Sequence, residues 1–504
     1  MMGSSTRRGS VSPSHDSFKS PVKPASLASE KNRALKKVDQ SKVYGFLDRM
    51  RQGIHCSFCG GAKCKHENWE YARESGHDIA IEGLASSWVG ADVIASQRPS
   101  TSLFKKHSLI EQFKERGITG VLNLQEKGEH ARCGPDGVYA STGYSYDGEE
   151  DLMRFKISYY EFPWADMTAP KQDIVLRSVQ VMDSHVKKSG KVLVHCHAGL
   201  GRTGLIIACY LVYAHRMPSA DVIAMVRERR PGAIQTSKQV RFVYEFEAHL
   251  RKLSHTFRLG VSDSAVDIDV FLKKQRLLLH GEHADFYRFI PMPIYILLRQ
   301  LLSITSGDSS KSDLVLTSLR SSASPPESVL DDIRVSINGR SFDETSVKDV
   351  LPLCHLVWGW FKSLAMPALL SEETSAIVAY MREPPCGRSA QRRFIRRTLR
   401  PSALHTAEML LSAIYVISLN AEDSFMSQAL QRVIELLTRA DGGEGAAHLS
   451  LLELELLHKF FGMWVDLVKG MYFSFGCARV RDENNVRTAK VSTVRLPTGL
   501  KNNE

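Results

Sequence analysis

The sequence predicts an α/β domain with a mainly parallel sheet flanked by helices, followed by a mostly helical C-terminal region. In residues 81–255, short apolar runs alternate with helical patterns, which is typical of a parallel sheet covered by helices. In residues 331–480, apolar residues recur mostly at helical spacing. The composition is that of a globular protein, because 43% of the residues are hydrophobic and 24% are charged.

The individual elements of the α/β domain follow from local patterns. Short apolar or alternating runs predict strands over 117–124, 155–162 and 191–195. Apolar residues stepping by three or four, with Gly190 and Pro231 as end signals, predict helices over 175–186, 203–215 and 219–229. The C-terminal region is expected to contain helices over 430–437 and 449–468.

These patterns divide the chain into seven parts. Residues 1–45 form a basic tail rich in Ser, Lys and Pro, which we expect to be disordered because it has little apolar surface to bury. The other parts are a cysteine-rich segment (46–80), the α/β domain (81–255), a helical extension (256–302), a Ser- and Asp-rich linker (303–330), the helical region (331–480) and a tail (481–504).

The positive charge is confined to two short segments. The net charge is +11, yet residues 1–55 alone carry +7 and residues 388–400 carry +6. A folded basic face is therefore not expected, and neither is a nucleic-acid partner. Residues 388–400 have the pattern of a basic amphipathic helix, which can bind an anionic membrane surface or an acidic partner, or can simply be a solvated face.

The remaining bulk features indicate a cytoplasmic or nuclear protein. The N-terminus lacks the residue order of a signal peptide, and no apolar run approaches the ~18 residues of a membrane helix. Nine cysteines at irregular spacing in a long chain favour a reducing compartment. The sequence does not indicate an oligomeric state.

The string VHCHAGLGRTG at residues 194–204 lies between a predicted strand and a predicted helix. The positive end of that helix and the charge of Arg202 both favour a nucleophilic thiolate at Cys196. Gly199, Gly201 and Gly204 let successive backbone N–H groups point into one bowl. Amides and a guanidinium together fit a phosphate dianion, so the string predicts a phosphate site with a thiol at its base. The alternative is a glycine-rich turn around a buried thiol.

The complete string resembles the signature of the cysteine-based protein tyrosine phosphatases, of the dual-specificity-like type. The resemblance extends along one branch of that superfamily over roughly residues 50–285, including the segments 86–89, 95–100 and 128–130. It implies a cysteine-phosphatase fold, with Cys196 as the nucleophile that forms a phosphocysteine and Arg202 as the phosphate ligand. It implies that Thr203 stabilises the leaving thiolate. The substrate-binding loop would consist of His197, Ala198, Gly199, Leu200, Gly201 and Arg202.

The family also requires a general acid, usually an aspartate upstream of the cysteine. Trp164, Ala165 and Asp166 match the family's Trp-x-Asp pattern, with Ala where many members have Pro. Asp166 is therefore the candidate acid and, in the second step, the base. Asp151 and Asp173 lack the aromatic neighbour, and the alternative role for Asp166 is a helix cap.

The resemblance also suggests a glutamine that positions the hydrolytic water. Gln235 is the first choice for this role and Gln239 the reserve, although either side chain could simply be solvated. His195 would help to set the loop, or would only be packed at the end of its strand.

The sequence favours a protein substrate over an inositol lipid. A core of about 170 residues is short for a tyrosine-only phosphatase and suggests a pocket open to phosphotyrosine and also to phosphoserine and phosphothreonine. No lysine lies between Cys196 and Arg202 to meet additional phosphates, although His197 could carry partial charge. A phosphate-binding scaffold without activity is the other alternative, and an association with centrosomes or cilia is suggested by analogy only.

No metal is expected in the chemistry, but the cysteine-rich segment suggests a structural zinc. Cys56 and Cys59 have the Cys-x2-Cys spacing that lets two thiolates meet one zinc ion, and Cys64 could be a third ligand. For the fourth position Cys133 is the choice adopted here, with His55, His66 and His130 also open. Reduced structural cysteines are the alternative.

Overall fold

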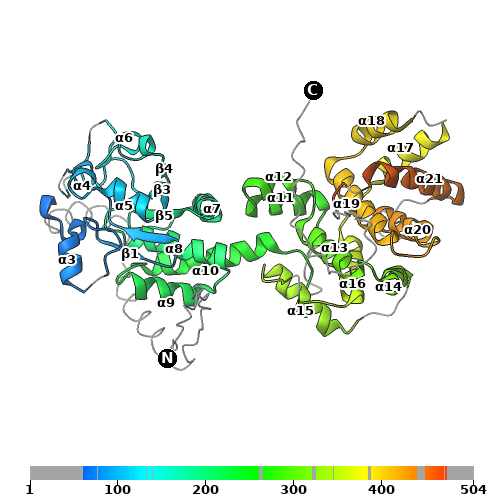
Figure 1. Cartoon of the computed structure of the whole chain (residues 1–504), viewed down its shortest axis with the longest axis horizontal. Helices are drawn as coiled ribbons and strands as arrows, with labels where there is room; N and C mark the ends of the chain where they lie inside the picture. Colours follow the sequence, from blue (N-terminus) through cyan, green and yellow to red (C-terminus); the bar gives the residue numbers. More distant parts are fainter. Residues whose placement is uncertain are drawn as a thin grey trace, which may run out of the picture.

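The computed structural model describes residues 61–473, except 77, 132, 135, 140, 260–264, 321–324, 344–345, 384–386, 440–448 and 470. The described residues form an α/β domain and a helical domain that lie next to each other (Figure 1). The tails expected at 1–45 and 481–504 lie outside the described residues, as do Cys56, Cys59 and His55.

The α/β domain is built on a five-stranded sheet with the order β1-β2-β5-β3-β4. The strands are β1 (Ser86–Trp88), β2 (Val93–Ser96), β3 (Ile118–Asn123), β4 (Ser158–Glu161) and β5 (Lys191–His195). Only the β1–β2 pair is antiparallel; β5 is parallel to β2 and β3, and β3 is parallel to β4. The predicted, mainly parallel sheet is confirmed.

Alternate residues of β5 enter separate cores on the two faces of the sheet. Val192 and Val194 belong to one core, whereas Leu193 belongs to the other. The helical elements of this domain are η1 (Gly61–Lys63), η2 (Lys65–Glu67), α3 (Trp69–Glu74), α4 (Thr101–Lys106), α5 (Leu109–Glu115), α6 (Gly148–Asp151), η3 (Met153–Phe155), α7 (Gln172–Lys187), α8 (Gly201–His215), α9 (Ser219–Arg229) and α10 (Ser237–Ser254).

Helix α8 is the centre of the domain. Every residue from Gly201 to Tyr213 is buried, which explains why its sequence is apolar on all sides. It starts directly beyond the carboxyl end of β5, so the loop between them lies at the positive end of a buried helix.

The C-terminal region forms a single helical domain with one continuous core. Its helices are α11 (Ile268–Leu278), α12 (Gly281–Phe286), α13 (Met292–Thr305), α14 (Ser309–Arg320), α15 (Glu327–Asn338), α16 (Val350–Ser363), α17 (Ser371–Arg382), α18 (Gly387–Thr398), α19 (Pro401–Ser418), α20 (Phe425–Thr438) and α21 (Leu451–Val468). The core extends from Phe257 to Phe473. The expected extension at 256–302 is therefore part of the same domain as the helices that follow it.

The structure corrects the linker expected at 303–330. Helix α14 lies within it and packs against α16 and α20, with Val315 fully buried. The Ser- and Asp-rich composition of this segment indicated a loop. The segment instead forms a helix in which Val315 faces the core.

Helix α18 carries the basic segment and buries its apolar side. Ile395 is buried and the ring of Phe394 stacks on Tyr380, with ring centroids 4.0 Å apart. The arginines on the other side, from Arg388 to Arg397, are exposed. The apolar face of this helix therefore packs inside the domain, and its arginine side chains face the solvent.

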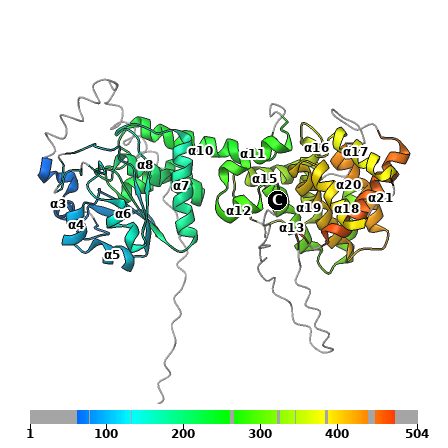
Figure 2. The ribbon, with the colours of Figure 1, turned by 90° about the horizontal axis from the view of Figure 1, so that it is seen from above.

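The two domains meet where α7 and α10 approach α11 and α12, as both views show, and α10 packs against α11 and α15 (Figure 2). The hydroxyl of Tyr213 donates to the carbonyl of Leu278 at 2.7 Å, and Leu278 itself belongs to a core of the α/β domain. The carboxylate of Asp183 on α7 lies 2.7 Å from Nε2 of His280. Among the described residues, none of the helices is long and apolar enough to cross a membrane.

Candidate active site

The signature loop, residues 196–202, connects β5 to α8. Its backbone carbonyls are held from outside: that of His197 accepts from the amide of Arg98 at 3.0 Å, and that of Leu200 accepts from the amide of Ile234 at 3.3 Å. Arg230 donates to the carbonyls of Ala198 and Gly199, each at 3.2 Å. Because a trans peptide directs its N–H opposite to its C=O, the amides that follow these carbonyls point to the inner side of the loop.

The glycine at position 199 is required by the shape of this loop. Its φ is +70°, which favours glycine, and a Cβ atom there would lie 2.2 Å from the carbonyl oxygen of Ser96. The loop can therefore curl against the end of β2 only with glycine at this position. Gly201 is less constrained, because a Cβ there would meet Oε1 of Gln235 at 2.6 Å, the end of a flexible side chain that can move.

The guanidinium of Arg202 is fully buried and surrounded by acceptors. Nη1 donates to the carbonyls of Leu124 and Trp164, at 3.1 and 3.0 Å. Glu129 binds both terminal nitrogens, with Oε2 at 2.7 Å from Nη1 and Oε1 in contact with Nη2. Burial opposes the charge, but Asp166 and Glu129 outweigh it and raise the pKa of Arg202.

The candidate acid, Asp166, lies against this guanidinium. Its Oδ1 is 3.1 Å from Nε of Arg202, and its Oδ2 is 3.6 Å from Nε2 of His130. Burial raises the pKa of Asp166, but Arg202 and His130 outweigh burial and hold it below its ordinary value. The carboxylate is therefore ionised in this arrangement and occupies the position next to Nε of Arg202.

The rival aspartates lie elsewhere. Asp151 accepts from the hydroxyl of Thr101 and the amide of Asp147 in α6. Asp173 is exposed in the first turn of α7, and the residue at the N-cap of that helix is Lys171. Asp166 thus does not cap α7, and it is the aspartate that the structure brings to Arg202.

His195 and Thr203 flank the loop at its two ends. The ring of His195 is fully buried, with Nε2 at 2.6 Å from the hydroxyl of Tyr146 and Nδ1 at 3.2 Å from the carbonyl of Cys196. Burial lowers the pKa of His195 to about 3, so this ring is neutral. The hydroxyl of Thr203 is buried and has no hydrogen-bond partner among the described residues.

The two candidate glutamines have different environments. Gln239 is buried and forms a capping box with Thr236 at the start of α10. Its Oε1 also accepts from the backbone amide of Gln235 at 2.9 Å. Gln235 is exposed, and its side chain lies over Gly201 of the signature loop. Gln235 is the one whose amide is left available beside the loop.

The side chain of His197 differs from the expectation that it lines the substrate site. It is 6% exposed, and its Nε2 lies 2.7 Å from Oε1 of Glu67 and 3.9 Å from Sγ of Cys64. Burial opposes its charge, but the hydrogen bonds to Cys64 and Glu67 outweigh burial and raise the pKa of His197 to about 9. Only the backbone of this residue faces the inner side of the signature loop, as part of its chain of amides. Of the predicted zinc ligands, Cys64 and Cys133 both lie beside His197 and Glu67.

Sequence reasoning missed the residues that hold the loop and its arginine. Glu129, Arg98 and Arg230 are far from the signature string in the sequence, and nothing in their spacing indicated a shared site. Segments 95–100 and 128–130 contributed to the family resemblance, but the sequence did not indicate a function for Arg98 or Glu129 within them. Their roles depend on the contacts described above.

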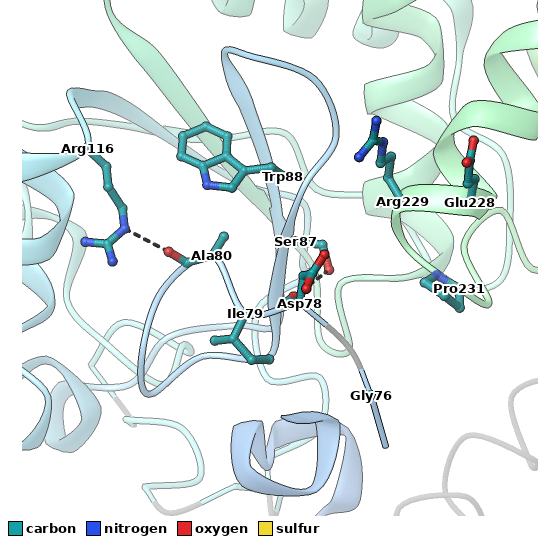
Figure 3. A pocket seen from close by; sticks show the side chains of 10 residues that line it. All are labelled: Gly76, Asp78, Ile79, Ala80, Ser87, Trp88, Arg116, Glu228, Arg229 and Pro231. Carbon is teal, nitrogen blue, oxygen red and sulfur yellow. Dashed lines mark hydrogen bonds between the residues drawn. The ribbon is translucent and has the colours of Figure 1, made fainter. Parts of the chain in front are cut away.

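A hollow of about 770 Å³ lies outside this site (Figure 3). It is lined by residues of β1 and its preceding segment and by the end of α9, and none of its lining residues belongs to the signature loop. Its charged side chains are Asp78, Arg116, Glu228 and Arg229, so both signs are present. Arg116 donates across its edge to the carbonyl of Ala80 at 2.8 Å.

Comparison with known proteins identifies the α/β domain. Residues 103–249 match the family model described as the dual specificity phosphatase catalytic domain. These residues form a domain of the dual-specificity phosphatase family, within the protein tyrosine phosphatase superfamily. The expected cysteine-phosphatase fold is thereby confirmed.

Curated relatives match mainly over this domain. Protein tyrosine phosphatase domain-containing protein 1 of Mus musculus is 42% identical over 254 residues, 50% of this chain and 33% of the relative. The protein of the same name in Danio rerio is 39% identical over 265 residues, 52% of this chain and 36% of the relative. Dual specificity protein phosphatase CDC14A of Homo sapiens is 26% identical over 194 residues, covering 38% and 29%. The match thus spans about a third of the length of these relatives.

Solved structures also match. Tk-PTP in its active form is 23% identical and has a TM-score of 0.26, with 32% of this chain and 96% of that chain covered. Kinase associated phosphatase is 23% identical and has a TM-score of 0.28, with 33% and 94% covered.

Proposed function

We propose that this chain is a protein phosphatase that hydrolyses phosphotyrosine, and also phosphoserine and phosphothreonine, through a phosphocysteine intermediate. The observation that carries the proposal is the combination at one loop of a thiol, inward-facing amides and a buried arginine that touches the candidate acid. Cys196 begins the loop, and Arg202 ends it with its Nε 3.1 Å from Asp166.

In the first step, Sγ of Cys196 attacks phosphorus and the bond from phosphorus to the substrate oxygen breaks. The loop amides and Nε of Arg202, from which the substrate displaces Asp166, bind the non-bridging oxygens and stabilise their charge. Asp166 donates a proton to the leaving oxygen. A tyrosine oxygen has a pKa of about 10, so this proton lowers the barrier substantially.

Substrate binding would prepare Asp166 for this role. In the unliganded site Asp166 is paired with Arg202, which keeps it ionised. A phosphate dianion at Nε of Arg202 replaces this pairing and places negative charge beside Asp166. Both effects favour the protonated carboxyl that the first step requires.

In the second step, water attacks the phosphocysteine and the thiolate leaves. Asp166 accepts the proton of the water, and the exposed amide of Gln235 is placed beside the loop to orient it. Thr203 directly follows the loop, and its buried hydroxyl has no hydrogen-bond partner among the described residues. This hydroxyl would donate a hydrogen bond to the leaving thiolate.

The same experiment distinguishes this proposed function from two alternative functions. A phosphate-binding scaffold would bind phosphopeptides without turnover. A phosphoinositide phosphatase would need cationic side chains for additional phosphates, whereas the loop has no lysine and the imidazole of His197 faces Glu67.

The test is phosphate release by the full chain from matched phosphotyrosine, phosphoserine and phosphothreonine peptides and from phosphoinositides. We expect turnover on peptides, above all phosphotyrosine peptides, that Cys196→Ser abolishes. Cys354→Ala, which changes a buried cysteine of α16 in the other domain, is the matched control and should retain turnover. Peptide binding without turnover would favour the scaffold, and turnover on lipids alone would favour the phosphoinositide phosphatase.

A further inference from the structure

Four metal-binding side chains converge behind the signature loop. Their ligand atoms lie within 4.8 Å of one another, and all four residues are buried. We call them the thiol–histidine cluster, which consists of Cys64, Glu67, Cys133 and His197.

The four donors come from separate parts of the chain. Cys64 and Glu67 flank and end the short helix η2, and Cys133 follows the segment that contains Glu129 and His130. His197 belongs to the signature loop itself. No local sequence pattern places these residues together, so their convergence is a property of the fold.

The donor set fits a zinc ion by type and by size. Two thiolates, an imidazole and a carboxylate are ligands that zinc accepts in tetrahedral geometry. With bonds of about 2.3 Å to sulfur and about 2.0–2.1 Å to nitrogen and oxygen, the ligand atoms of such a site lie about 3.3–3.8 Å apart. Ligand atoms up to 4.8 Å apart would have to approach each other by about 1.0–1.5 Å, and Nε2 of His197 and Oε1 of Glu67, now 2.7 Å apart, would have to separate to about 3.3 Å. The Nε2–Sγ distance between His197 and Cys64 is already 3.9 Å.

We propose that the thiol–histidine cluster binds one structural zinc ion, with the loop histidine as a ligand through Nε2. Binding releases the protons of the two thiols and of Nε2. Two thiolates and a carboxylate then balance the charges of the zinc ion and of Arg98, which is buried beside them.

Surrounding contacts already orient the ligands. Nε of Arg98 lies 3.0 Å from Oε1 of Glu67, and its Nη2 donates to the carbonyl of Cys133 at 2.5 Å and to that of His130 at 3.0 Å. Arg98 is fully buried and thus a fixed support for two ligand segments. Such supporting contacts are typical of metal sites, where they hold the ligands in place.

The site would stiffen the phosphate loop from behind. His197 directly follows Cys196, so a bond from its ring to zinc fixes the loop next to the nucleophile. The ring of His130 stacks on His197 with centroids 3.6 Å apart and reaches Asp166 with its other edge. Through these two rings the zinc site would be connected to the candidate acid.

The competing explanation is a hydrogen-bonded network without metal. In that network a protonated imidazole of His197 lies between the sulfur of Cys64 and the carboxylate of Glu67. A third state is a disulfide between the two cysteines. The three states differ in metal content and in free thiols, which can be measured directly.

The first experiment measures zinc in the full chain after purification and dialysis against metal-free buffer. We expect about one zinc ion per chain from this site, and loss of that equivalent in Cys133→Ser and in Cys64→Ser. Cys354→Ser alters a buried cysteine remote from the cluster, and Cys196→Ser removes the proposed nucleophile; both should retain the zinc. Because metal content is read without turnover, failure of the proposed phosphatase activity would not affect this result.

The second experiment needs no variant. X-ray absorption at the zinc edge of the wild-type chain should show two sulfur and two nitrogen or oxygen ligands. Four sulfur ligands would overturn the proposal in favour of the all-cysteine site that the sequence suggested. Wild-type protein that contains no zinc when purified from zinc-supplemented medium, or Cys133→Ser protein that folds and retains its full zinc content, would also overturn it.

Discussion

Asp166 contacts Nε of Arg202, where the proposed mechanism places the substrate phosphate, so removing its charge should separate binding from catalysis. Asp166→Asn keeps the size of the side chain but removes the negative charge 3.1 Å from Nε of the guanidinium. A hydrogen bond to a charged group is worth about 1.5–3 kcal/mol. A phosphate-like dianion no longer has to displace that interaction, so its affinity should rise about 10- to 100-fold.

Turnover should change in the opposite direction. A positioned general acid contributes about 10²–10⁴-fold to the rate, and the amide of asparagine has no proton to give. The loss should be largest for phenolic leaving groups with a pKa of about 10 and smaller for aryl phosphates with more acidic leaving groups.

The assay combines titration calorimetry with tungstate and turnover of a phosphotyrosine peptide, on the full chain and at one salt concentration. Asp173→Asn removes an exposed carboxylate from the first turn of α7 and is the matched control, with both quantities unchanged. Tungstate binding that is unchanged or weaker in Asp166→Asn would refute the competition for Arg202. Turnover close to that of the wild type would refute the assignment of Asp166 as the acid.

Three further predictions concern the loop, the domain junction and the basic helix. Gly199→Ala forces a Cβ to 2.2 Å from the carbonyl oxygen of Ser96 at a φ of +70°, so tungstate binding should be lost while far-UV circular dichroism is retained; binding near the wild-type level would contradict the loop geometry. Asp183→Asn removes the carboxylate bound to His280 and should lower stability by about 1.5–3 kcal/mol, seen as a lower melting temperature and faster proteolysis between the domains. Burial opposes ionisation of Asp183, but His280 and a nearby lysine outweigh burial and lower its pKa. Its stabilisation is thus complete above the unfolded pKa of about 3.9 and is lost as the pH falls through the lower folded pKa. The difference in melting temperature should therefore be the same at pH 7 and pH 5 and should shrink only as the pH falls below about 3.9. Replacing the four central arginines of α18 with serine should reduce co-sedimentation with anionic vesicles, by about 1 kcal/mol per arginine at the surface; equal retention of both proteins would leave this helix as a solvated face.

The sequence was most informative where one short segment determines both structure and chemistry. The predicted strand at 191–195 and helix at 219–229 match β5 and α9, and the glycines around Cys196 predicted the loop between β5 and α8. These features depend on neighbouring residues, so periodicity and spacing reveal them. The candidate acid, Asp166, was suggested by the Trp-x-Asp pattern of the family that the sequence resembles, a pattern that lies within three neighbouring residues.

Features that depend on distant contacts could not be predicted. Strands β1 and β2 have three and four residues, too few to establish a period. Glu129 is identified as a partner of Arg202 only when the chain has folded, because many surface glutamates have the same local sequence character. His197 was placed in the substrate loop by its position, but its ring points to Glu67, since the direction of one side chain in a tight loop depends on what packs behind it.

The contact between Tyr213 and Leu278 determines where the catalytic part of the chain can be cut. Leu278 lies beyond the boundary at residue 255, yet it fills a place in the core of the α/β domain. A fragment that ends at residue 255 would lose Leu278 from this core and the packing of α11 on α10, and would leave the hydroxyl of Tyr213 without its acceptor. A fragment that ends after His280 retains both contacts but exposes Ile268, Phe271 and Leu272 of α11, which belong to the core of the helical domain. The α/β domain is therefore best studied together with the whole helical domain.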